Sequence, residues 1–347
     1  MESSPTLNGF IEYATKNGAS DIHLSSTNKP IVRIDGELRE IPDSTIINSI
    51  ELVGMLDSIM SDAQRSVYQE KLELDFAITS QSGVRFRVNA FNTINGSAAV
   101  FREIPAENIS LLEISAPAVL SDLCKLEQGL ILVVGPTGSG KSTTLAAMIN
   151  HINENYKRHV LTIEDPVEFT YKSNLSLINQ REVGINTASF PNALKSALRE
   201  DPNVIMVGEM RDLETIRLAL TAAETGHLVM ATLHTNSAAQ SINRIIDVFP
   251  SSDKDLVRSM LASSLRAVIS QRLARKKNGG RAAVYEIMIS NSSIRNLIRE
   301  DKVPQLNSMI EIGKKQGMVT AKDSVLDLFN RDIISKETAE RLLASIE

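Results

Sequence analysis

The sequence predicts an α/β protein in which a small α+β module precedes a helix-covered parallel sheet and a helical C-terminal extension. Three observations carry this prediction. Strand patterns dominate up to residue 104, short apolar runs alternate with helical patterns from residue 118 on, and helical patterns alone follow Glu286. Strands that alternate with helices build a parallel sheet covered by helices. The 347 residues suffice for two domains that each bury a core.

The first module is predicted over residues 1–104. Its strands are expected at 31–35, 73–79, 84–91 and 97–104, with one helix at 49–71 between the first two. Asn95-Gly96 predicts a tight hairpin turn before the last strand. The period of two along 84–91 places Arg85 and Arg87 on one face, with Asn89 and Phe91, and places Val84, Phe86, Val88 and Ala90 on the other.

Residues 105–117, which begin and end with proline, are expected to form a linker. The sheet domain is predicted over 118–288, with strands at 130–134, 159–163, 204–207 and 228–232 and helices near 141–153, 189–199, 213–224 and 237–248. A helical subdomain is expected over 289–347. Its last helix shows a helical apolar period after Ser335, a favourable N-cap residue.

Composition excludes several classes of function. The net charge of −5 argues against nucleic-acid binding, which usually requires a basic surface. The single cysteine, Cys124, cannot form an internal disulfide or a cysteine-based zinc site, and it fits a reducing cytoplasm. No run approaches the ~20 apolar residues of a membrane span, and the first residues lack a signal-peptide pattern. We therefore expect a cytoplasmic protein that reaches membranes only through partners.

Residues 130–144 read LILVVGPTGSGKSTT, an apolar strand-like run that ends in a Gly-x-x-x-x-Gly-Lys-Ser loop. This pattern predicts a nucleoside triphosphate site at Gly135, Pro136, Thr137, Gly138, Ser139, Gly140, Lys141, Ser142 and Thr143. The glycines let backbone N–H groups point at the β-phosphate, which also lies at the positive end of the following helix. We expect Lys141 to reach the β- and γ-phosphates and Ser142 to bind Mg²⁺.

A P-loop enzyme needs carboxylates at the ends of neighbouring strands, where they hold the metal shell and orient the attacking water. The run 204–207 ends in Gly208-Glu209, and a glycine cannot bind metal where many P-loop proteins carry an aspartate. Glu209 is therefore the candidate that polarises the water. Glu164 and Asp165 follow the run 159–163 and are candidates for the metal side, and Glu164 is the predicted ligand.

His227 and His234 bracket the predicted strand at 228–232. Histidines at strand ends are commonly ordinary hydrogen-bonding residues. A position after a glycine and beside Thr235 also fits a sensor of the γ-phosphate, because a neutral imidazole donates with one nitrogen and accepts with the other. Two histidines without a third ligand at motif spacing do not indicate zinc.

Arg85, Arg87 and Arg102 lie on predicted strands of the first module. One interpretation is a solvated strand face. The other is a set that pairs with phosphate oxygens, because a planar guanidinium matches them well. The basic run 272–277, before two glycines, is interpreted as a solvated loop, with docking of acidic partners as the alternative.

Together these residues resemble the secretion-type traffic ATPases, and among them the type IV pilus retraction ATPases, over nearly the whole chain. The segments that carry the resemblance are 18–24 (GASDIHL), 162–169 (TIEDPVEF), 208–212 (GEMRD), 226–235 (GHLVMATLHT) and 293–300 (SIRNLIRE). The last is similar to a retraction segment that the family usually begins with Ala rather than Ser293. Assembly and type II secretion ATPases typically carry a longer N-terminal region and a four-cysteine zinc insertion, so the single cysteine favours the retraction branch.

The resemblance implies a PAS-like N-terminal domain and a RecA-like P-loop ATPase domain that use ATP and Mg²⁺. It also implies a homohexameric ring at the cytoplasmic base of the pilus machine, bound to an inner-membrane platform protein. In the family, nucleotide lies at the interdomain interface, which would bring Arg85, Arg87 and Arg102 to the phosphates.

The expected function is an ATP-hydrolysing motor that retracts type IV pili. An accessory retraction paralogue and a similar ATPase of a type IV secretion system stay open as alternatives within the superfamily. Two other classes share the P-loop: a ring scaffold that binds ATP but hydrolyses it little, and a small-molecule kinase that transfers phosphate to a soluble acceptor.

Overall fold

The computed structural model describes residues 6–34, 36–104 and 109–346. The chain divides into two compact units, Met1–Glu107 with Glu168–Thr170 and Asn108–Val167 with Tyr171–Glu347. Part of the predicted linker, residues 105–108, lies outside the described residues. Within the described residues, every helix is too short or too polar to cross a membrane.

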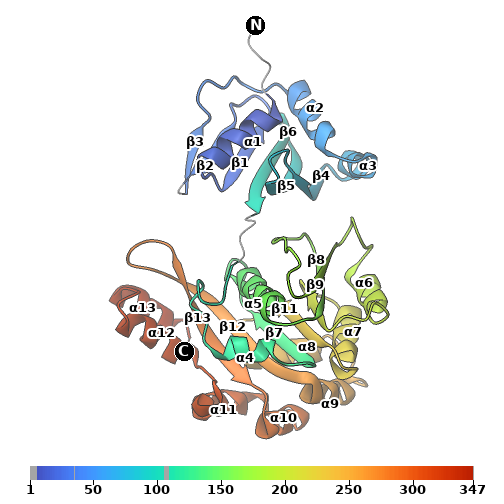
Figure 1. Cartoon of the computed structure of the whole chain (residues 1–347). Coiled ribbons are helices and arrows are strands. Elements are labelled where there is room, and N and C mark those ends of the chain that lie inside the picture. The colour runs from blue at the N-terminus through green and yellow to red at the C-terminus, as the bar shows by residue number, and fades with distance from the viewer. Residues whose placement is uncertain (1–5, 35, 105–108, 347) are drawn as a thin grey trace. The chain divides into compact units, whose positions relative to one another are not determined.

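The first unit is an antiparallel sheet packed against helices (Figure 1). Its elements are α1 Leu7–Lys16, β1 Asp21–Ser25, β2 Ile31–Ile34, β3 Glu37–Glu40, α2 Ser49–Ile59, α3 Asp62–Lys71, β4 Glu73–Thr79, β5 Arg85–Thr93 and β6 Gly96–Ile104. The strand order is β3-β2-β1-β6-β5-β4. Apolar residues of α1, α2 and one sheet face form its core. The patterns had not predicted α1, β1 or β3, and the PAS-like character of the unit stays a prediction.

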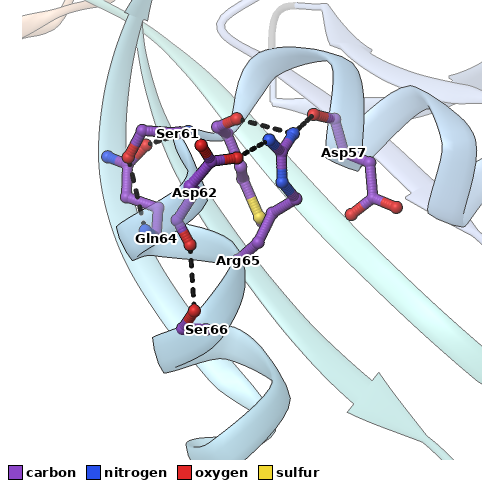
Figure 2. Close-up of polar contacts among 7 residues, drawn as sticks. Asp57, Ser61, Asp62, Gln64, Arg65 and Ser66 are labelled. Atoms are coloured by element: carbon purple, nitrogen blue, oxygen red, sulfur yellow. Dashed lines mark hydrogen bonds and ion pairs between the residues drawn. The ribbon is translucent and has the colours of Figure 1, made fainter.

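The single helix predicted over 49–71 is wrong, because the chain breaks between α2 and α3. Ser61 has extended backbone and caps α3: its hydroxyl accepts from the Gln64 N–H, and the Gln64 side chain accepts from the Ser61 N–H. The Arg65 guanidinium then donates to the carbonyls of Asp57, at 2.7 Å, and Met60, at 3.1 Å (Figure 2). Both ends at the break are thus satisfied by side chains.

The hairpin between β5 and β6 differs by one residue from the prediction. Thr93 pairs with Gly96, so the turn residues are Ile94 and Asn95 and the glycine belongs to the strand. A β-carbon on Gly96 would lie 2.7 Å from the Ser49 hydroxyl, so the glycine is required by close packing. The alternation along β5 is confirmed, because Phe86, Val88 and Ala90 are buried whereas Arg85 and Arg87 are half-exposed.

The second unit is a helix-covered sheet of seven strands in the order β13-β12-β7-β11-β10-β8-β9, parallel except for the edge strand β13. Its elements up to the end of the sheet are α4 Val119–Cys124, β7 Gly129–Val134, α5 Lys141–Asn155, β8 His159–Glu164, β9 Leu177–Glu182, α6 Phe190–Ala197, β10 Val204–Val207, α7 Leu213–Glu224, β11 Leu228–Leu233, α8 Ala238–Asp247, α9 Lys254–Ser264, β12 Leu265–Arg275 and β13 Arg281–Ile289. The last two strands form an antiparallel hairpin.

The core of this unit has two layers, one on each face of the sheet. Leu130 and Leu132 of β7 pack with apolar residues of α6 to α10, whereas Ile131 and Val133 pack with α4 and α5. Strands buried on both faces explain the continuous apolar runs of the sequence. The predicted α/β fold class is confirmed, with the four expected strands present as β7, β8, β10 and β11.

Several parts of the sequence prediction for this unit are wrong. The patterns missed β9 and the β12–β13 hairpin, and the basic run is not a loop throughout, because Arg272 and Arg275 belong to β12. Strand structure also continues past Glu286, to Ile289. The hairpin strands were hidden because β12 mixes buried polar with apolar residues.

Helices follow the hairpin to the end of the described chain: α10 Ser292–Arg299, α11 Leu306–Ile312, α12 Ala321–Asn330 and α13 Lys336–Ala344, with short 3₁₀ turns at Val303–Gln305 and Gly313–Gln316. The predicted N-cap is confirmed, because the Ser335 hydroxyl accepts from the Thr338 N–H at 3.2 Å. Residues of α12 and α13 form a small core with the outer part of the β12–β13 hairpin (Figure 1).

Candidate nucleotide-binding site

The Gly-x-x-x-x-Gly-Lys-Ser segment forms a tight loop between β7 and α5 at the carboxyl edge of the sheet. Gly135, Gly138 and Gly140 have φ of +150°, +76° and +87°, a backbone region in which other residues are strained. Gly140 is the N-cap of α5, which begins at Lys141. The first N–H groups of a 15-residue helix therefore face the loop, an arrangement that suits an anion.

Lys141 folds back onto this loop. Its side chain is buried, and its ammonium donates to the carbonyl oxygens of Gly135, at 2.9 Å, and Pro136, at 3.1 Å. A positive charge is thus held beside the loop at the place where the sequence pattern expects phosphate. Ser142 and Thr143 follow in the first turn of α5.

Glu164 ends β8 at the same edge of the sheet and is buried. Its Oε1 accepts from the Thr162 hydroxyl at 2.6 Å and from the Gln180 amide at 3.2 Å. These donors fix the orientation of the carboxylate, as partners of metal-binding carboxylates do.

Gly208 lies directly beside Glu164 and packs tightly against the backbone of β8. Its N–H donates to the Ile163 carbonyl at 2.8 Å, and a β-carbon would lie only 3.2 Å from that oxygen and 3.3 Å from Glu164 Cα. The glycine therefore lets the end of β10 pack against the backbone of β8. The same contact brings the next residue, Glu209, to the strand that carries Glu164.

Glu209 is held between two basic side chains. Its Oε2 pairs with Arg211 at 2.7 Å and its Oε1 with His234 Nε2 at 3.3 Å. Burial opposes ionisation of Glu209, but the hydrogen bond from Arg211 and the nearby His234 and Arg211 outweigh it and hold the pKa of the carboxyl below its ordinary value. A carboxylate with a lowered pKa stays charged and orients water better than it removes a proton.

The two histidines lie at opposite ends of the central strand β11. His234 follows the last residue of β11, beside Glu209. His227 precedes the first, where its carbonyl accepts from the Gly129 N–H and its ring Nδ1 lies 3.0 Å from the Ala222 carbonyl. Because β7 and β11 are parallel and in register, about 20 Å of strand separates this position from Gly135. Within this unit His227 therefore lies away from the phosphate-binding loop, and its binding of the phosphates stays a prediction.

Arg85, Arg87 and Arg102 lie on the first unit, on the sheet face opposite its core. Arg87 and Arg102 are direct cross-strand neighbours, and Arg85 is two residues before Arg87 on the same strand face. Arg102 donates to Asp21 at 2.8 Å and Arg87 pairs with an aspartate of β4 at 3.3 Å. The structure groups the three cations on one face, and their role toward phosphate stays a prediction.

Sequence reasoning missed several neighbours of these residues. Arg211 lies two residues after Glu209 in the segment 208–212, and the motif by itself does not assign it as the partner of that carboxylate. Thr162 and Gln180 were overlooked because β9, which carries Gln180, was not predicted. Gln271, which packs against Gly135 and Gly140 of the phosphate-binding loop, was overlooked because β12, which carries it, was not predicted either.

Comparisons with known proteins show the family to which the chain belongs. A family model described as "Type II/IV secretion system protein" matches residues 3–330. A "Twitching motility protein" of Neisseria gonorrhoeae is 54% identical over 313 residues, which cover 90% of this chain and 83% of that protein. The type IV pilus retraction ATPase PilT of Pseudomonas aeruginosa is 51% identical and covers 95% of this chain and 96% of its own.

Two further matches place the chain among its relatives. The type IV pilus ATPase PilU of Pseudomonas aeruginosa is 36% identical, over 95% of this chain and 86% of that protein. A crystal structure of the pilus retraction motor PilT with bound ADP superposes with a TM-score of 0.91 at 44% identity, covering 98% of this chain and 97% of that one.

Proposed function

This chain belongs to the type II/IV secretion system protein family, and from that premise we propose that it is the ATPase that powers type IV pilus retraction. The proposal depends on one observation: a complete P-loop and the Glu209–His234 pair lie together at the carboxyl ends of the parallel strands. The identity of 51% to a pilus retraction ATPase, against 36% to PilU, favours the retraction ATPase over its accessory paralogue.

ATP binding begins at the loop. The phosphates displace the ammonium of Lys141 from the carbonyls of Gly135 and Pro136, and the lysine then pairs with the β- and γ-phosphates. The N–H groups of the loop and of the first turn of α5 donate to the same oxygens. The exchange replaces two neutral acceptors of the lysine by charged ones.

Two acids divide the remaining work. Hydroxyl and carboxylate oxygens are the ligands that Mg²⁺ prefers, so Ser142 and Glu164 fit a metal that would neutralise phosphate charge. Glu209 orients the water that attacks the γ-phosphorus in line, as the bond from that phosphorus to the bridging oxygen of ADP breaks. His234, which pairs with Glu209, senses the loss of the γ-phosphate.

The mechanical work of the proposed motor follows from the release of the γ-phosphate on hydrolysis. Arg85, Arg87 and Arg102 pair with the phosphates, and hydrolysis releases that pairing. Six copies form a ring in the cytoplasm, at the inner-membrane base of the pilus machine. Their motion passes to a platform protein in the membrane, which disassembles the fibre.

ATP hydrolysis by the purified protein tests the chemistry. Lys141→Ala and Glu209→Gln should each lower kcat about 100-fold or more, because each removes a charged group at the reacting phosphate. Phosphate release is measured beside two exposed controls, Lys29→Ala and Glu214→Gln, which should match the wild type. Wild-type release no faster than that of either site variant would leave a scaffold rather than an ATPase.

Assembly and direction of force need separate measurements. Light scattering should find a species of about six copies when Mg-ATP is added, whereas a strict monomer with and without nucleotide would favour a soluble kinase. Deletion of the gene should give surplus surface pili and loss of surface motility. A deletion strain without pili would instead indicate an assembly ATPase.

A further inference from the structure

Gln271, a buried residue outside the sequence motifs, contacts the phosphate-binding loop from the neighbouring strand β12. Gln271 lies on β12, the parallel neighbour of β7, and follows Ser270, which is in register with Val134. The register therefore brings Gln271 level with Gly135, where the loop begins. Its exposed fraction is 3%, although glutamine is seldom so buried.

The backbone of Gln271 closes off the start of the loop. A β-carbon on Gly135 would overlap the carbonyl oxygen of Gln271, so only glycine allows β12 and the loop to approach this closely.

The side chain of Gln271 supports the other end of the loop. A β-carbon on Gly140 would lie 2.8 Å from Gln271 Nε2, so the amide group packs against the last loop residue. The amide oxygen Oε1 accepts from the Thr144 hydroxyl at 2.7 Å, in the first turn of α5. Thr144 is fully buried, and its N–H donates to the Gly140 carbonyl at 3.0 Å.

We propose that Gln271 is a positioning residue for nucleotide binding, because it holds both ends of the phosphate-binding loop and the first turn of α5 in one arrangement. The residue does not touch the nucleotide. It acts through the loop N–H groups, whose directions depend on the backbone that Gln271 supports. The proposal rests on the proposed nucleotide site.

The amide group suits this position for two reasons. Its oxygen satisfies the buried Thr144 hydroxyl, which a methionine of similar length would leave without that acceptor. A glutamate would keep the acceptor but place a negative charge behind a loop that receives phosphate. The two substitutions therefore separate the hydrogen bond from the charge.

Affinity for a fluorescent ADP analogue with Mg²⁺, measured on the full chain, tests the proposal. Gln271→Met should weaken binding about tenfold and Gln271→Glu by at least as much, because loop geometry is lost in the first and repulsion added in the second. Thr144→Val should weaken binding in the same direction from the helix side. The Gln271→Met/Thr144→Val double variant should bind no worse than Gln271→Met alone, because both remove one hydrogen bond.

Ser264→Ala is the matched control. Ser264 is also buried, and its hydroxyl donates to the Met260 carbonyl at 2.8 Å, just before the other end of β12. We expect it to lower the Tm of the nucleotide-free protein without changing ADP affinity.

Each result decides the proposal. Variants at Gln271 and Thr144 that lower Tm but bind ADP within twofold of the wild type would reduce Gln271 to a purely structural residue. Strictly additive losses in the double variant would overturn the shared hydrogen bond. If Gln271→Met does not fold, Thr144→Val removes the same bond and decides alone. A wild-type protein that binds no ADP would count against the proposed function itself, a distinguishable outcome.

Discussion

Glu209 shows how neighbours assign a chemical role to a single residue. A general base works best with a pKa near the working pH, whereas the partners of Glu209 move its pKa the other way. The charged carboxylate can still orient a water molecule, and it lies 3.3 Å from the Nε2 of His234. At the residue scale, the structure therefore favours positioning over proton removal.

Asp21 is the buried acid of the first unit and carries a pH-dependent prediction. Burial raises the pKa of Asp21, but hydrogen bonds from Arg102 and Ser20 and the charge of Arg102 outweigh it, so the pKa lies below its ordinary value of 3.8. A carboxyl with a lowered pKa stabilises the fold above the unfolded-state pKa, and this contribution is lost as the pH falls through the folded-state pKa.

Asp21→Asn should therefore lower the free energy of unfolding by about 1–2 kcal/mol at pH 7. The difference from the wild type should shrink as the pH falls below about 4, because the carboxyl of the unfolded chain then takes up its proton before that of the folded protein. Urea unfolding at pH 7 and at pH 3 measures this. Asp75→Asn, at a half-exposed ion pair with Arg87, should cost less than about 1 kcal/mol. An equal loss for Asp21→Asn at both pH values would contradict the electrostatic explanation.

At the scale of elements, the junction of α2 and α3 shows how two short helices replace one long one. The helical pattern of 49–71 was correctly recognised, but the local capping signals at Ser61 and Gln64 were stronger than its continuity. Arg65 then crosses back to the last carbonyls of α2, where a cation is favoured by the helix dipole (Figure 2).

Removal of this link should loosen the first unit. Arg65→Ala should cost about 1–2 kcal/mol, because the carbonyls of Asp57 and Met60 lose a charged donor. Thermal unfolding followed by circular dichroism measures the loss. The comparison variant is Arg39→Ala, whose exposed pair with Glu37 should contribute less than about 0.5 kcal/mol. Equal effects of the two substitutions would mean that the junction adds no stability.

At the scale of the whole molecule, the two units have separate cores. One core draws only on residues up to 101, and the other cores draw on residues from 111 on. Each unit therefore has the buried apolar residues that independent folding requires. The phosphate-binding loop belongs to one unit and the three candidate arginines to the other.

Residues 109–347 alone should fold and bind ADP through the loop, because the loop and its supports lie within them. Hydrolysis of ATP should fall at least about tenfold relative to the full chain, since Arg85, Arg87 and Arg102 are missing. Steady-state phosphate release and ADP binding measure both parts, with full-length Lys141→Ala as the inactive reference. A fragment that hydrolyses ATP as fast as the full chain would exclude a role for these arginines in hydrolysis.

The sequence by itself determined the features that depend on neighbouring residues along the chain. The phosphate-binding loop follows from glycines that reach positive φ, the β5 alternation from a period of two, and the α13 cap from Ser335. The order of the strands has no such local signature. Only the tertiary structure decided that Glu209 contacts His234, that His227 lies at the end of β11 away from the phosphate-binding loop, and that Gln271 supports the loop. These relations join residues distant in sequence, and hydrophobic periodicity does not specify which strands become neighbours.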